Sequence, residues 1–111
     1  MTYQSIVKTM AKLSVLLEKF KADNAHILNN YDPMKAEPQE RLVLRFYEGC
    51  IMGGVFRDNI ELAKSAPMLF VKNVQMMLQA QEHIQFTLHG IVTTGAAQKL
   101  RDDFKKIVYE M

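Results

Sequence analysis

The stretch from Arg41 to Lys64, RLVLRFYEGCIMGGVFRDNIELAK, decides how the rest of the chain can fold. Its middle part, Gly49–Phe56, carries no charge, and its apolar side chains would point in every direction around a helix. A helix that is apolar on all sides is normally surrounded by other protein or by lipid. A membrane span needs about 20 apolar residues, and here Arg45, Glu48 and Arg57 flank the uncharged run too closely. We therefore expect this stretch to be the central helix of a small helical bundle.

Gly49, Gly53 and Gly54 lie inside this expected helix, where each glycine costs about 1 kcal/mol relative to alanine. Three explanations are open: a close crossing by another helix, a kink at Gly53-Gly54, or space for a small ligand or cofactor beside Gly49 and Gly53. We favour the close crossing. Cys50 stands in the same apolar run, so we expect a buried and unreactive thiol. A single cysteine also fits a reducing compartment.

Length and composition indicate one domain spanning residues 1–111. The hydrophobic fraction of 49% is ample for a core without disulfides or metals. A net charge of +2 and a charged fraction of 23% argue against a dedicated nucleic-acid-binding domain, which usually has a clustered basic face. Lysines and polar residues interrupt every apolar group near the N-terminus, so we find no signal peptide and expect a cytoplasmic protein.

Residues 3–31 show the clearest helical periodicity, with inward positions at steps of three and four. Asn24 is the one polar member of this stripe. The opposite face carries Lys8, Lys12 and Lys19, which we interpret as solvated; contact with nucleic-acid phosphates is the alternative. The stripe consists of Tyr3, Ile6, Met10, Leu13, Leu17, Phe20, Asn24, Ile27 and Tyr31.

Further helices are expected at 38–65 and 67–92, and a shorter one follows Thr94, whose hydroxyl can cap it. Turn residues in the segment 29–37 separate the first two helices. The pattern predicts an all-α fold, an antiparallel up-down-up-down four-helix bundle with three long helices and a shorter C-terminal one. The expected inward stripes are Phe70, Val74, Met77, Gln81, Ile84, Leu88 and Ile91 in the third helix, and Ala97, Leu100, Phe104, Ile107 and Met111 in the fourth.

The sequence offers no constellation for catalysis or metal binding. A di-metal bundle needs Glu-x-x-His pairs, but Gln85 stands three residues after Glu82. The spacing of His83 and His89 in the sequence puts them on different sides of a helix. There is no haem-attachment motif and no strand-linked phosphate loop. We therefore expect a protein that is not an enzyme and holds neither a metal nor a cofactor.

Charge is depleted from Pro67 to Thr94, where the only charged residues are Lys72 and Glu82. Low charge around an aromatic residue is typical of a contact surface. The alternative is that this helix is the most central one and packs on several sides. The 8 methionines could line an adaptable groove or, as we favour, fill gaps in the core. The predicted partner-binding face consists of Gln75, Gln79, Glu82, Phe86 and His89.

These observations predict a non-catalytic protein–protein interaction module. Its class would be a small cytoplasmic adaptor, an inhibitor, an immunity-type protein or a secretion-chaperone-like protein. The expected partner is another protein or a second copy of the chain, so that a homodimer forms through the charge-poor face of the third helix. A nucleic-acid-associated regulator that uses Lys8, Lys12 and Lys19 is the alternative, and ligand binding beside Gly49 and Gly53 is a further one.

Overall fold

Every regular element that the computed structural model describes, within residues 2–91 and 95–111, is helical. The predicted all-α helical bundle is therefore confirmed, whereas the predicted cap Thr94 lies outside the described residues. Segments η1 and η3 are π-helices, and η2 is a 3-10 helix. The elements are α1 (Tyr3–Asp23), α2 (Ala25–Asn29), α3 (Gln39–Arg45), η1 (Phe46–Phe56), η2 (Arg57–Asn59), α4 (Ile60–Ser65), α5 (Pro67–Glu82), η3 (His83–Leu88) and α6 (Gly95–Tyr109).

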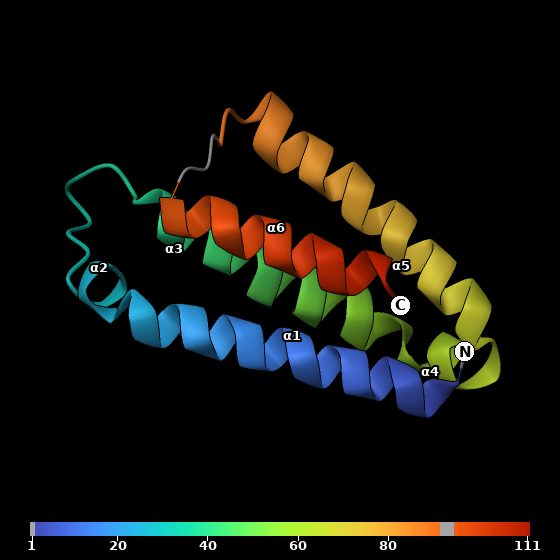
Figure 1. Ribbon diagram of the computed structural model, residues 1–111. Coiled ribbons are helices and arrows are strands. Elements are labelled where there is room, and N and C mark those ends of the chain that lie inside the picture. Colours follow the sequence, from blue (N-terminus) through green and yellow to red (C-terminus); the bar gives the residue numbers. More distant parts are fainter. Residues whose placement is uncertain (1, 92–94) are drawn as a thin grey trace.

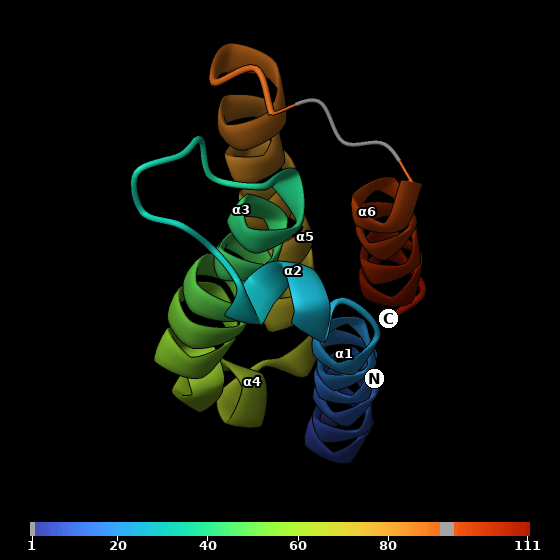
Figure 2. The ribbon, with the colours of Figure 1, turned by 90° about the vertical axis from the view of Figure 1, so that its left-hand side faces the viewer.

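The long helical segments alternate in direction along the bundle (Figure 1). They are α1, the segment from α3 to η2, the segment from α5 to η3, and α6. Helix α6 lies along α1 and also contacts α3. The segment from α5 to η3 contacts η1 and α4 near its start, and diverges from α6 as it runs toward Leu88 (Figures 1 and 2). One side of α5 and η3 is therefore left without a neighbouring helix among the described residues.

Helix α1 forms where the periodicity predicts it. Thr2 caps its start, and the Thr2 side chain and the Ser5 side chain each bond the other residue's backbone N–H, as in a capping box. The backbone leaves helical geometry at Asn24, which separates α1 from the short α2. The predicted inward stripe is confirmed, because its central members are buried and its end members partly so. The buried members are Ile6, Leu13, Leu17, Phe20 and Asn24.

The predicted second helix is continuous through its glycines, but much of it has π-helical geometry. Because a π-helix bonds i to i+5, its buried positions come at wider steps than in an α-helix. Backbone dihedrals stay helical past Gly53 and Gly54 and depart only at Asn59, so the bend lies there and not at the glycines. Asn59 also bonds the Val55 carbonyl through its side-chain amide, at 2.6 Å. The buried side chains of η1 are Phe46, Tyr47, Ile51, Val55 and Phe56.

Beyond Val74 the inward stripe predicted for the third helix is only partly right, since Gln81 and Ile91 are half-buried. Met77, Ile84 and Leu88 are exposed, and the buried row instead continues through other residues, at steps of four. Steps of four drift around an α-helix, which has 3.6 residues per turn, and the change to the wider π-helix at His83 keeps the drifting row inside. The buried row consists of Phe70, Val74, Leu78, Glu82 and Phe86.

Neighbouring residues on α5 test this rotation. Leu78 is fully buried, whereas the side chain of Met77 is 39% exposed. Leu78→Ala is expected to lower the free energy of unfolding by about 2–5 kcal/mol. Met77→Ala should change it by only about 0.5 kcal/mol. Chemical denaturation of the two variants measures both values, and a larger cost at Met77 than at Leu78 would contradict the rotation.

Candidate functional site

The predicted partner-binding face does not lie on one exposed side of the third helix. Phe86 and Glu82 are buried, with 8% and 5% of their surfaces exposed. Gln75 is half-buried, and its side-chain amide donates a 3.2 Å hydrogen bond to the Val108 carbonyl of α6. Gln79 and His89 are exposed. The physical reason is the four-residue step of the buried row, which rotates the middle of the predicted face into the core.

The exposed side of α5 and η3 carries large apolar side chains instead. Met76 and Leu88 are 60% and 68% exposed, and Ile84 is 48% exposed. We name these apolar residues of α5 and η3 the α5 row. Glu82 points inward, so Lys72 is the only charged residue of Pro67–Leu88 on the outer side. The α5 row consists of Leu69, Met76, Met77, Ile84 and Leu88.

Glu82 sits in a buried polar cluster formed by three segments. Its carboxylate accepts a 3.0 Å hydrogen bond from the hydroxyl of Tyr47, on η1. From α6, Lys105 Nζ lies 3.6 Å from one carboxylate oxygen and Arg101 Nε lies 3.9 Å from the other. An isolated buried charge would be strongly destabilising. These three partners compensate it and hold α5, η1 and α6 in one arrangement.

Aromatic rings surround this cluster. The Tyr47 ring packs on Phe104 at 4.3 Å and on Phe46 at 4.9 Å between centroids. Phe86 meets Phe46 edge to face at 5.3 Å, and the Arg101 guanidinium lies 4.8 Å from the centre of the Phe86 ring. Such pairs add about 0.5–1.5 kcal/mol beyond area burial. Phe86 is therefore a core anchor rather than a surface contact.

Burial raises the pKa of Tyr47 well above that of a free tyrosine, and the negative charge of Glu82 raises it further. The hydroxyl of Tyr47 therefore remains a neutral donor to the carboxylate.

Gly49, Cys50, Gly53 and Gly54 occupy the outer side of η1. Cys50 is exposed, so the expectation of a buried thiol is wrong. The close helix crossing is also wrong: among the described residues, nothing lies within 4 Å of a Cβ placed on Gly49 or Gly54. At Gly53 the nearest atom is the side-chain nitrogen of Arg57, at 3.2 Å, from the same helical segment. The reason is the wider π-helical step, which puts the large apolar residues inside and the small ones outside.

The remaining predictions concern the lysines of α1, metal binding and a membrane span. Lys8, Lys12 and Lys19 are exposed on α1, as expected, and Val15 lies among them with 69% of its side chain exposed. The nucleic-acid hypothesis stays a prediction. In the described part of the chain, no group of three or more His, Cys, Asp or Glu is placed to hold a metal ion. No described helix is both long and apolar enough to cross a membrane.

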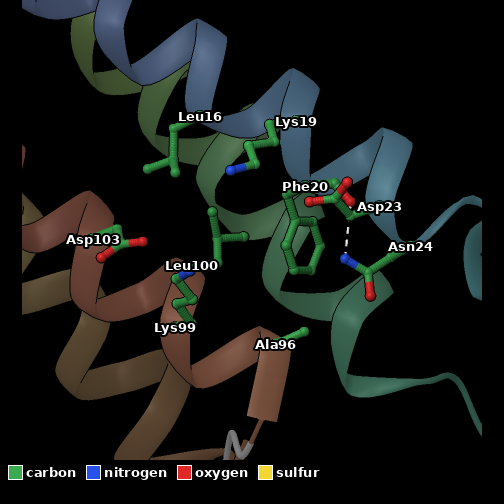
Figure 3. Close-up of a pocket in the computed structure, with 9 residues that line it drawn as sticks. All are labelled: Leu16, Lys19, Phe20, Asp23, Asn24, Ala96, Lys99, Leu100 and Asp103. Atoms are coloured by element: carbon green, nitrogen blue, oxygen red, sulfur yellow. Dashed lines mark hydrogen bonds between the residues drawn. The ribbon is translucent and has the colours of Figure 1, made fainter.

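A cavity of about 300 Å³ lies between α1 and α6. Its wall includes Leu16 and Phe20 from α1, and Ala96 and Leu100 from α6 (Figure 3). No residue of η1 lines this cavity, so it is a different place from the ligand space beside Gly49 and Gly53 that is one of the alternatives for these glycines. The sequence signal that could have revealed it is a Lys-x-x-x-Asp spacing that both helices share.

The pH dependence of folding tests the buried Tyr47 hydroxyl. An unfolded chain ionises tyrosine at a pKa of about 10, whereas the folded protein keeps Tyr47 neutral beyond that pH. Stability should therefore fall above pH 10, by about 1.4 kcal/mol per pH unit from this residue alone. Tyr47→Phe removes that contribution, so denaturation curves should show its stability converging on that of the unchanged protein as pH rises. Parallel pH profiles would contradict the buried, neutral hydroxyl.

The exposure of Cys50 has a direct chemical test. We expect a thiol reagent to label native Cys50 at a rate within about tenfold of the rate in denaturant, because access rather than unfolding limits the reaction. Absorbance of the released chromophore measures both rates. Labelling that proceeds only as fast as global unfolding would show that the thiol is buried.

Of the α5 row, the Glu82 cluster and the cavity, the α5 row presents large apolar side chains directly to solvent. The Glu82 cluster is internal, and the cavity is small. Comparison of the chain with protein-family models, with curated proteins and with solved structures finds no match.

Proposed function

We propose that this chain is a non-catalytic, cytoplasmic protein–protein interaction module that pairs with a second copy of itself through the α5 row. The observation that carries the proposal is the exposed set of Met76, Ile84 and Leu88 along one side of α5 and η3. Burying one such side chain contributes about 1.5–3 kcal/mol. Leaving several of them in water has a cost that a partner surface removes.

The low charge of this side favours a second copy as the partner. In a two-fold symmetric dimer, each surface meets the same surface of the other subunit. A charged surface would then face its own like charges, whereas Lys72 is the only exposed charge that α5 and η3 themselves carry. Together α5 and η3 provide ~30 Å of helix, which suits side-by-side packing of two antiparallel helices. Methionine adds adaptability, because its unbranched side chain fills irregular gaps.

Sedimentation equilibrium of the purified protein tests this proposal. The unchanged chain should form a dimer with a dissociation constant in about the micromolar range. Met76→Glu and Ile84→Glu should each weaken the dimer at least about tenfold, because they place a charge in the centre of the apolar contact. Phe86→Glu is not suitable, since Phe86 is in the core and the substitution would destabilise the fold.

Val15→Glu is the matched control. Val15 is an exposed apolar residue on α1, so its substitution adds the same charge without touching the α5 row. We expect the dimer to persist in this variant, with circular dichroism confirming that all variants are folded. An unchanged chain that stays monomeric at all concentrations would refute self-association. Equal weakening by Val15→Glu would refute the α5 row as the interface.

A further inference from the structure

The cavity between α1 and α6 has an apolar wall and a charged rim. Phe20 and Leu100 are almost fully buried and supply the wall, together with Leu16. Lys19 and Asp23 from α1 contribute to the rim (Figure 3), and α6 contributes a second lysine and a second aspartate, which are Lys99 and Asp103. Its volume of about 300 Å³ is at the lower end of the range for small-molecule sites.

The four rim charges are uncommitted. Within residues 2–91 and 95–111, Lys19, Asp23, Lys99 and Asp103 form no ion pair. Nearby lysines on the same two helices behave differently: Lys21 contacts Glu18 and Glu48, and Lys105 contacts Glu82. Both signs of charge are therefore available at the cavity to a bound molecule.

Asn24 adds a buried polar group at one end of the cavity. It is 7% exposed, and its side-chain nitrogen donates a 2.9 Å hydrogen bond to the Phe20 carbonyl. The side-chain oxygen is left as an acceptor, and Asp23 lies at the same end (Figure 3). Asp103 lies at the other end, with Lys19 and Lys99 between the two aspartates (Figure 3).

We propose that this cavity binds a small zwitterion with an apolar body, of the class of a free amino acid with a branched or aromatic side chain. The carboxylate of the ligand would lie between Lys19 and Lys99. Its ammonium group would lie at the end formed by Asp23 and Asn24, where the carboxylate of Asp23 accepts its hydrogen bonds. The apolar side chain would pack on Phe20 and Leu100.

The two lysines and two aspartates of the rim favour a zwitterionic ligand over an anionic or a cationic one. A purely anionic ligand would meet the lysines but would also lie beside Asp23 and Asp103, which repel it. A purely cationic ligand would meet the opposite conflict at Lys19 and Lys99. A polar zwitterion without an apolar body would leave the apolar wall wet. This site is separate from the α5 row, so the inference goes beyond the proposed interaction function.

Titration calorimetry and thermal denaturation with a matched ligand panel test the proposal. The panel is leucine and phenylalanine as apolar zwitterions, N-acetyl-leucine as the anion, leucinamide as the cation, and glycine as a zwitterion without an apolar body. We expect saturable binding of leucine or phenylalanine, at least about tenfold tighter than of the other three. Failure of both to bind at millimolar concentration, or equal binding of N-acetyl-leucine, would overturn the proposal.

Two variants locate the binding. Ala96→Leu fills the cavity from an exposed position and should abolish binding, and Lys99→Gln should weaken it about tenfold by removing a carboxylate partner. Lys12→Gln removes the same charge from α1 outside the cavity and is the control. Unchanged binding by Ala96→Leu, or equal loss in Lys12→Gln, would place the ligand elsewhere and overturn the assignment. Sedimentation of the same samples reports separately on the dimer.

Discussion

The orientation of α5 about its own axis buries one carboxylate, that of Glu82, in a row whose other members, Phe70, Val74, Leu78 and Phe86, are apolar. A buried charge must be compensated where it lies, and here the hydroxyl of Tyr47 and the cations Arg101 and Lys105 meet it from η1 and α6. Turning α5 outward would leave these groups without their carboxylate. With Glu82 turned inward, the opposite side of the helix faces solvent. The apolar side chains of the α5 row are on that side and are therefore exposed.

The sequence predicts the fold well where the helical period is regular. The stripe of α1 recurs at steps of three and four, as the α-helix requires, and its members Ile6, Leu13, Leu17, Phe20 and Asn24 are buried. On α5 the same spacing rule predicts that Met77, rather than Leu78, is buried. A row through Leu78 would also contain Glu82, which the rule places outside because it is charged. The partners that make Glu82 tolerable inside come from distant parts of the chain. Single-sequence periodicity has no access to such contacts.

Helix geometry explains the second set of differences. Around Cys50 the sequence is apolar on every side of an α-helix, which predicts burial all round. In the π-helix η1 the large residues fall on one side, from Phe46 to Phe56, and Gly49, Cys50 and Gly54 fall on the other. The glycines therefore keep that side small without any helix crossing it. A change of helical pitch is a tertiary outcome, because packing against neighbouring helices rather than local propensity selects it.

Ile84 and Phe86 lie two residues apart on η3 and face opposite ways, one to solvent and one to the aromatic cluster. The same short segment, η3, therefore carries both an exposed apolar side chain and a side chain of the core. Any partner that buries Ile84 and Leu88 also stabilises the helical state that keeps Phe86 against Phe46, since binding to the folded form adds to its stability. The same segment diverges from α6, so its inner contacts are few and its outer side is unprotected (Figure 1). Because η3 has few contacts inside the protein, a partner on its outer side would stabilise it more than a partner could stabilise α1 and α6, which already pack tightly on each other.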